Sequence, residues 1–455
     1  MRRRRVKLLR RLVREDLARG SSVNIGFILT SLVLQLVSGL ALAAFLGPAG
    51  VGAFAIGMLV LDTVMAVVHL PGVAFVREYS TEEREQALAT VAAFKLVLCV
   101  PASCAILLLS GFLASVFSVP AAMIAILALY PPLAALASIA TMVFEARRTM
   151  TRRNIPGLAE NAGRVAAVLA LTSGAALMGT RPEAAAVAWV AAAVPAAVVS
   201  VALAGMPRLR LAHFGKAREY FAFGWRTTIA HLLQKQLLWV GTAAIYLAYL
   251  GTSLDQAQAE SGLFKLAYSL MFYMVLIGAA VPGMLYPLLS RAFSITDPEE
   301  RRREAHRLMS LAFYYELILA LPLALLLVVL GPWAFAFALP AFVPSGPLAQ
   351  LLAVSGVLFC LTLPAAVALP AANRPDLTLR LFLVSAATAG ALNIALVPQI
   401  GAPWGGAVGA VIADWATAAV GLVYALYLTR HIGIPMPSYA VFRAALKAKA
   451  RPPPA

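Results

Sequence analysis

The chain has 455 residues, of which 62% are hydrophobic and 13% are charged, and its formal net charge is +17. Soluble domains carry about 25% charged residues, so this composition excludes an ordinary soluble protein. The charge does not indicate nucleic-acid binding either, because the basic residues lie in short gaps and the aromatic residues lie in the apolar stretches between them.

Apolar stretches long enough to cross a membrane follow one another along almost the whole chain. A helix of about 20 apolar residues spans the hydrocarbon core, and lipid requires the backbone to pair within each segment. The stretches lack the alternation of barrel strands. We therefore predict an all-α integral membrane protein with about 12 transmembrane helices and no separate catalytic domain. The expected spans are 24–46, 51–75, 88–114, 120–144, 159–178, 184–205, 219–250, 262–289, 306–330, 346–370, 377–399 and 405–429.

The basic residues indicate the orientation of these spans. Nearly all of the 37 Lys and Arg residues lie in the two tails, in alternate gaps, or at the span ends beside those gaps. This is the pattern that the positive-inside rule gives when both termini are cytoplasmic. The exceptions are Arg181, in an opposite gap, and Lys95, Arg164, Arg226, Lys235 and Lys265, within spans.

The gap after the sixth span divides the chain into two halves of six helices each. We expect a basic N-terminal segment at 1–20, which is either an amphipathic helix on the membrane surface or a disordered tail that sets orientation. A first bundle at 21–205, a cytoplasmic linker at 206–218, a second bundle at 219–430 and a basic cytoplasmic tail at 431–455 follow. Both halves begin in the cytoplasm, so any repeat would be parallel.

Ionisable residues in mid-span are the candidates for function. A charge at the bilayer centre costs about 2.5–3.5 kcal/mol, so it faces a cavity or a partner. Lys95 lies in the third span, and His231 and Lys235 share one face of the seventh. The acids are Asp62, Glu316 and Asp414.

Each of these charges has a structural alternative. Lys95 can pair with Asp62, and Asp414 with Lys235. Lys265, Arg226 and Arg164 lie near predicted span ends, where long side chains can snorkel to the head groups.

The sign of the interior charge indicates the kind of substrate. A cationic excess around a central cavity suits a phosphate or pyrophosphate, which Lys and Arg bind by charge-assisted hydrogen bonds. The acids can carry protons or sodium for coupling. The sequence has no phosphate-binding P-loop, no metal-binding Cys or His cluster and no nucleophile–base pair, so we expect neither an enzyme nor a bound cofactor.

Several short motifs resemble those of the Wzx-type polysaccharide flippases in the multidrug/oligosaccharidyl-lipid/polysaccharide exporter superfamily. They occur in the family's order: LGPAGVGAF at 46–54, VAFVRE at 73–78, GLFKLA at 262–267, PLLSR at 287–291, AANRPDL at 371–377 and GGAVGAVIAD at 405–414. An acidic residue common in the family's seventh helix is absent, and Lys235 lies there between two glutamines.

The resemblance implies two six-helix bundles around a central, cationic cavity in a bacterial inner membrane. It also implies that undecaprenyl-diphosphate-linked oligosaccharide moves to the outer leaflet by alternating access. Lys235, Lys95 and Arg226, with Arg164, Lys265 and His231, would line the substrate site, and Asp62, Asp414 and Glu316 would couple an ion or hold the cations. Membrane lipids and the substrate are the expected partners, with a polysaccharide polymerase or glycosyltransferases acting nearby.

Two other functions remain open at this stage. A drug or metabolite antiporter of the same superfamily predicts an acidic pocket for cationic compounds, and the interior cations speak against it. A membrane-embedded glycosyltransferase or polymerase usually has large external loops, whereas every such gap here is short.

Overall fold

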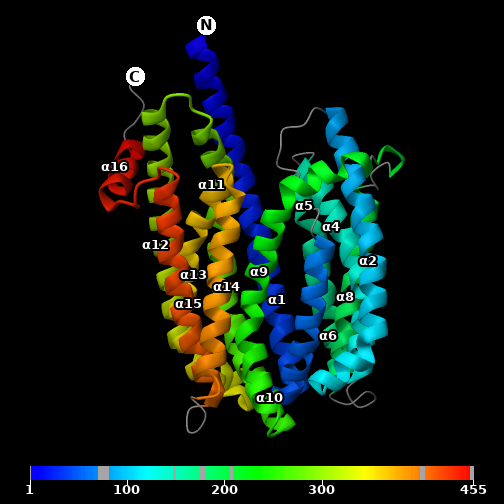
Figure 1. Cartoon of the computed structure of the whole chain (residues 1–455). Coiled ribbons are helices and arrows are strands. Elements are labelled where there is room, and N and C mark those ends of the chain that lie inside the picture. Colours follow the sequence, from blue (N-terminus) through cyan, green and yellow to red (C-terminus); the bar gives the residue numbers. More distant parts are fainter. Residues whose placement is uncertain are drawn as a thin grey trace. The chain divides into compact units, whose positions relative to one another are not determined.

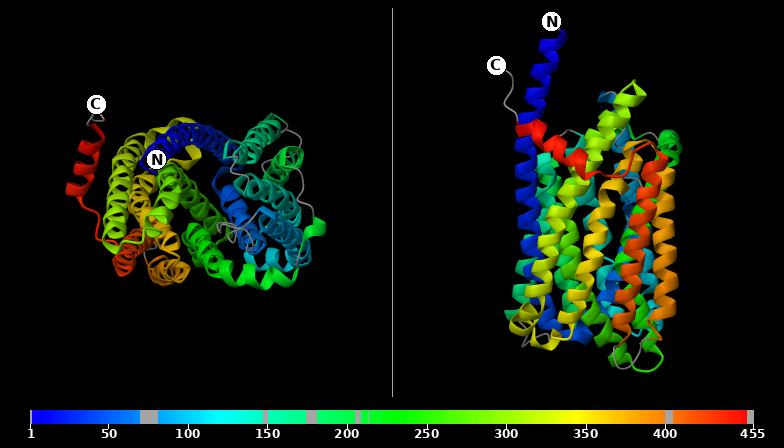
Figure 2. Two further views of the ribbon diagram at one scale, coloured as in Figure 1. Left: turned by 90° about the horizontal axis from the view of Figure 1, so that it is seen from above. Right: turned by 90° about the vertical axis from the view of Figure 1, so that its left-hand side faces the viewer.

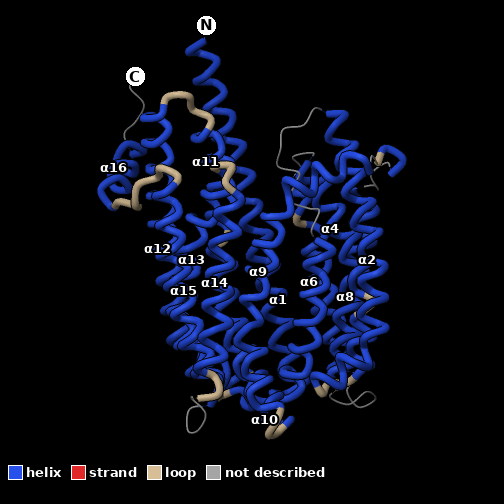
Figure 3. Tube along the Cα trace, viewed as in Figure 1, coloured by secondary structure: helices blue, strands red, loops and turns tan. Residues whose placement is uncertain are grey.

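The computed structural model describes residues 2–69, 81–146, 150–173, 181–204, 209–212, 214–399 and 405–450. Helices account for nearly all of these residues, and the described ranges contain no strand (Figure 3). The main helices in the first part of the chain are α1 (Arg2–His69), α2 (Thr81–Phe117), α3 (Ala121–Leu127), α4 (Tyr130–Ala146), α5 (Met150–Arg153), α6 (Ile155–Ser173) and α8 (Pro182–Ala204). The second part contains α9 (Ala217–Leu250), α10 (Leu254–Gly278), α11 (Ala280–Phe293), α12 (Pro298–Ala338), α13 (Ser345–Ala371), α14 (Pro375–Leu396), α15 (Gly405–His431) and α16 (Tyr439–Ala450) (Figure 1).

The predicted fold class is confirmed: the protein is an all-α, multi-pass membrane protein. Nine of the described helices are long and apolar enough to cross a membrane. The first two predicted spans are joined within α1, while α6 and α9 carry polar residues in mid-helix and fall outside this set. The predicted motif at 73–78 lies outside the described residues.

A sharp break separates the two spans within α1. Gly47 has φ 67° and ψ 175°, a backbone conformation that favours glycine, and Pro48 follows it. The LGPAG motif therefore ends one helical segment and starts the next, where the sequence predicts a boundary between 46 and 51.

Two predicted spans are each built from two helices. The span at 120–144 breaks between α3 and α4, because Pro131 and Pro132 have no N–H to donate back to the preceding turn. The span at 262–289 consists of α10 and α11, and the break at Gly278 lies four residues before Pro282. Moreover, α10 begins at Leu254 rather than at 262, where Ser253 caps it by accepting a hydrogen bond from the Gln256 amide.

The chain divides into two compact units near Gly224. The first contains 1–42, 67–116 and 120–224, and the second contains 43–66, 117–119 and 225–455. The second half of the α1 helix therefore groups with the second unit.

Small side chains and aliphatic clusters form the core of each unit. In the first unit, α6 packs closely on α8, and a β-carbon at Gly163 would lie 3.0 Å from the Ala192 carbonyl oxygen. Leu88, Val91 and Ile139 form an apolar cluster between α2 and α4. In the second unit, α13 lies at the centre and packs against α10, α11, α12, α14 and α15.

The C-terminal segment, expected from the sequence only as a basic tail, forms a helix. Helix α16 packs against the N-terminal part of α12, where Figure 2 shows it lying obliquely across its neighbours. Phe442 is buried and its ring lies 5.1 Å from that of Tyr314. The Ser438 amide donates to the Ser310 hydroxyl at 3.1 Å, and the His306 ring nitrogen Nε2 lies 2.9 Å from the Met436 carbonyl oxygen.

Removing the Phe442 ring is expected to release α16. Substitution of a buried Phe by Ala costs about 3–5 kcal/mol in protein cores. We therefore expect faster hydrogen exchange of the α16 amides in Phe442→Ala, with α13 unchanged. Arg443→Ala is the matched control, because Arg443 is the next residue and is exposed. Equal exchange rates of the α16 amides in the two variants would show that the Phe442 ring does not hold α16 in place.

Candidate functional site

The second half of α1 crosses α10 through a contact between two backbones. A β-carbon added at Gly52 would collide with the Gln258 carbonyl oxygen, and one at Gly262 would collide with the Pro48 carbonyl oxygen. Glycines allow helices in membranes to approach this closely. Both glycines belong to the motifs that carry the family resemblance. These motifs therefore have a structural role, because their glycines allow α10 to pack directly against α1.

This crossing brings three polar side chains together in the second unit. The Trp239 indole on α9 donates from Nε1 to Asp62 Oδ2 on α1 at 3.0 Å. The Lys265 Nζ on α10 lies 3.3 Å from the centroid of the Trp239 ring, and it interacts electrostatically with Asp62. A cation over an indole face is stabilised by about 2 kcal/mol when desolvated. Trp239 therefore holds both an acid and a cation.

Lys265 does not snorkel, in contrast to one of the sequence-based alternatives. That alternative assumed a span starting at 262, but α10 begins at Leu254 and places Lys265 three turns inside the helix. The sequence predicts a later start for this helix because several residues at 255–260 are polar.

Lys235 adds a second cation one turn from Trp239 on α9. Its side chain is exposed, and the described residues hold no ion pair between Lys235 and Asp414. The adjacent Gln236 donates to Thr63 on α1 at 3.2 Å. Lys235 and the Asp62–Trp239–Lys265 group thus lie on adjoining parts of α1, α9 and α10, and we call these four residues the cation cluster.

Two other predicted residues on α9 are not part of the cation cluster. Arg226 is exposed, and its guanidinium lies 5.4 Å from the ring of the neighbouring Trp225. His231 belongs to α9, but its side chain lies outside the described set.

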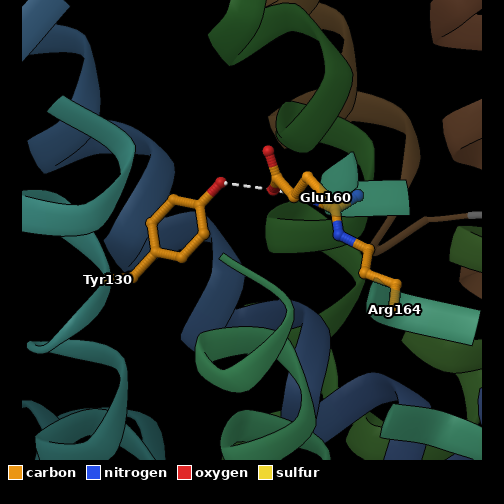
Figure 4. A network of polar contacts seen from close by, with 3 residues as sticks. All are labelled: Tyr130, Glu160 and Arg164. Carbon is orange, nitrogen blue, oxygen red and sulfur yellow. Dashed lines mark hydrogen bonds and ion pairs between the residues drawn. The ribbon is translucent and has the colours of Figure 1, made fainter. Parts of the chain in front are cut away.

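Arg164 belongs to a separate polar group in the first unit. It forms an ion pair with Glu160 on the same helix, and its guanidinium lies 3.8 Å from the centroid of the Trp189 ring on α8. Tyr130 on α4 points toward Glu160 and donates a hydrogen bond to it at 2.9 Å (Figure 4). The group ties α4, α6 and α8 together, and Arg164 is held there instead of snorkelling.

Lys95 is enclosed within the first unit. Only 1% of the residue is exposed, and its Nζ donates to the Ser138 hydroxyl on α4 at 2.5 Å. In this conformation the side chain faces the packed interface of α2 and α4. Contact between Lys95 and a substrate stays a prediction.

The two remaining acids lie on different sides of α13. Glu316 on α12 is fully buried, and neither carboxylate oxygen has a hydrogen-bond partner among the described residues. A β-carbon at Gly278 would lie 3.0 Å from Glu316 and 2.8 Å from the Cys360 sulfur, which places these three residues together at the break between α10 and α11. Asp414 on α15 lies beside the Ser355 hydroxyl and near Tyr268, but its buried Oδ2 lacks regular hydrogen-bond geometry.

An apolar cavity of about 70 Å³ lies within the second unit. Side chains from α9, α10, α13, α14 and α15 line it, among them Leu238, Met271, Phe359, Leu381 and Ala418. Gln234, the neighbour of Lys235, also borders it.

Solved structures with similar folds are membrane transporters. An inward-facing multidrug resistance MATE family transporter of the MOP superfamily has a TM-score of 0.64 at 14% identity, covering 95% of this chain and 100% of that one. The lipid II flippase MurJ in an inward closed conformation gives 0.61 at 11%, covering 94% and 91%. The MATE multidrug transporter DinF-BH gives 0.64 at 17%, covering 92% and 96%. At these identities the similarity defines the fold.

The fold is therefore that of a polytopic α-helical membrane protein, and solved structures that share it are transporters. The sequence matches the polysaccharide biosynthesis protein family over residues 41–341. The chain belongs to this family of Wzx-type proteins, which confirms the resemblance seen in its motifs. No curated protein sequence matches it.

Sequence reasoning missed Trp239 and Glu160. Glu160 precedes Arg164 by four residues, so an ion pair on one helix face was readable from spacing. Trp239 reads as an ordinary apolar residue, and its role depends on the position of Asp62, which lies 177 residues away.

Proposed function

We propose that this protein is a flippase for a lipid-linked oligosaccharide. Its substrate carries undecaprenyl diphosphate, and it crosses from the cytoplasmic to the outer leaflet of a bacterial inner membrane by alternating access. The product would serve cell-surface polysaccharide synthesis, together with glycosyltransferases and a polymerase. Family membership supports this proposal, as does a fold similar to that of a lipid II flippase.

The cation cluster is the observation that carries the proposal. Lys235 lies in mid-helix on α9 and Lys265 lies three turns inside the apolar helix α10, and a charge at membrane depth is retained only for a partner or a substrate. Asp62 neutralises one of these lysines in part, so a net positive charge remains for an anion. A diphosphate satisfies this charge through charge-assisted hydrogen bonds.

The remaining predicted residues have supporting roles in this proposal. Arg226, His231, Lys95 and Arg164 stay candidate substrate contacts in this proposal, as the sequence predicts. Glu316 is buried and Asp414 is half-buried, and both have carboxylate atoms without regular partners among the described residues. They are the groups that we propose to bind a proton or sodium during transport.

Lys235→Ala is expected to lower the flipping rate about tenfold or more, since charged hydrogen bonds contribute roughly 1.5–3 kcal/mol. The assay uses vesicles containing the purified protein and a fluorescent prenyl-diphosphate sugar, quenched from outside. Lys235→Arg should retain most of the rate. Arg303→Ala is the matched control, because it removes an exposed cation paired with Glu299 outside the apolar region. A rate in Lys235→Ala equal to that of the control would remove Lys235 from the mechanism.

The antiporter alternative gives a different result in the same vesicles. It predicts that a cationic dye crosses in exchange for protons or sodium while the lipid-linked sugar stays in its leaflet. That outcome would overturn the flippase proposal.

A further inference from the structure

The apolar cavity in the second unit has few polar side chains in its lining: Gln234, Tyr268, Thr362 and Ser385. Two of its polar side chains are already used within their own helices: Thr362 donates to the Leu358 carbonyl at 2.8 Å, and Ser385 donates to the Leu381 carbonyl at 3.0 Å. The rest of its lining is largely aliphatic and aromatic. Such a cavity favours a hydrocarbon group over water or a sugar.

The cavity borders the cation cluster on two helices. On α10, Lys265 shares a face with Tyr268 and Phe272, which line the cavity, because these residues are three and seven positions further along. On α9, Leu238 lines the cavity and follows Lys235 by three residues, so the two lie on neighbouring parts of one face. A ligand with its anionic end at the lysines therefore has an apolar space within reach.

We propose that this cavity binds the first isoprene unit of a prenyl diphosphate, the unit attached to the diphosphate. This inference rests on the proposed function and names a subsite of it. The diphosphate lies at Lys235 and Lys265, and the adjoining five-carbon branched group enters the cavity. The cavity is small, at about 70 Å³, so the rest of the polyprenyl chain stays in lipid.

Gly421 leaves part of this space open. It lines the cavity, and a β-carbon there would lie 3.3 Å from the Ser385 hydroxyl. Gly421→Ala therefore narrows the cavity, and the Ser385 hydroxyl must move by a few tenths of an ångström to admit the methyl group. Gly390→Ala on α14 is the matched control, since a β-carbon at Gly390 meets nothing within 4 Å.

The test measures calorimetric binding of three water-soluble probes to the purified full-length protein in detergent. The probes are inorganic diphosphate, dimethylallyl diphosphate with one isoprene unit, and geranyl diphosphate with two. Burial of one unit should make dimethylallyl diphosphate bind at least about tenfold more tightly than inorganic diphosphate, since each buried carbon contributes up to about 0.8 kcal/mol. The second unit should add less than about threefold, because it no longer enters the cavity.

The variants separate this inference from the proposed function. Gly421→Ala should weaken dimethylallyl diphosphate binding severalfold while leaving inorganic diphosphate unchanged, and Gly390→Ala should alter neither. Equal affinity of the wild type for inorganic and dimethylallyl diphosphate, or equal losses for both probes in Gly421→Ala, would overturn the subsite but not the flippase. Absence of diphosphate binding to the wild type would overturn both.

Discussion

Gly262→Val is expected to abolish transport and to lower the thermal stability of the protein. The new side chain would occupy the position of the Pro48 carbonyl oxygen, so α1 and α10 would have to separate. Overpacking of this kind costs about 1–3 kcal/mol, and more when the obstacle is backbone. Separation would also withdraw Lys265 from Trp239 and Asp62, and the cation cluster would lose its geometry.

Two measurements check this expectation: thermal unfolding of the purified protein, and flipping in vesicles. Gly111→Val is the control, since it adds the same side chain to a long apolar helix where a β-carbon meets nothing within 4 Å. Gly52→Val should behave like Gly262→Val, and the two together should be less than additive, because they disturb one crossing. Stability and transport of Gly262→Val that match the Gly111 control would show that the close crossing is dispensable.

Lys265→Gln is expected to reduce transport about 10- to 100-fold, since each charged hydrogen bond to a diphosphate contributes roughly 1.5–3 kcal/mol. The substitution also removes the cation from the Trp239 ring and leaves Asp62 with the indole N–H alone. Lys265→Arg keeps the charge and can stack on the same ring, so it should retain much of the activity.

A double substitution separates the substrate role of Lys265 from a structural one. If Lys265 only neutralises Asp62, Asp62→Asn should restore transport to Lys265→Gln, because no unpaired acid remains. If Lys265 binds the diphosphate, the double variant should stay inactive although its thermal stability recovers. Restored transport would therefore contradict the substrate role.

The sequence predicted the helical spans well, but it placed the functional side chains less well. Long apolar stretches identify membrane helices because lipid leaves few alternatives, and the turn at Gly47 could be read from its LGPAG motif. Prolines explain the breaks after α3 and α10. Many membrane helices tolerate proline, however, so a proline in the sequence does not show whether the helix breaks there.

The site depends on contacts between distant parts of the chain. Neither the hydrogen bond from Trp239 to Asp62 nor the stacking of Lys265 on Trp239 has a local pattern. Lys95 and Lys235 are equivalent in sequence, since each is a lysine in mid-span. The structure distinguishes them by surroundings: Lys95 is packed against Ser138, whereas Lys235 is exposed.

The glycine crossing between α1 and α10 also has a consequence for motion. Most helix pairs interlock through side chains, and one helix must change rotamers before it can pass the other. At Gly52 and Gly262 the closest atoms across the contact are the Gln258 and Pro48 carbonyl oxygens, and the short Ser261 side chain lies beside Gly52. At the glycines, parting the helices breaks van der Waals contacts of about 0.1–0.2 kcal/mol each. The attraction between Lys265 and Asp62 is the polar interaction that would also be lost. The two helices therefore pack closely, yet they can separate with few changes of side-chain rotamer.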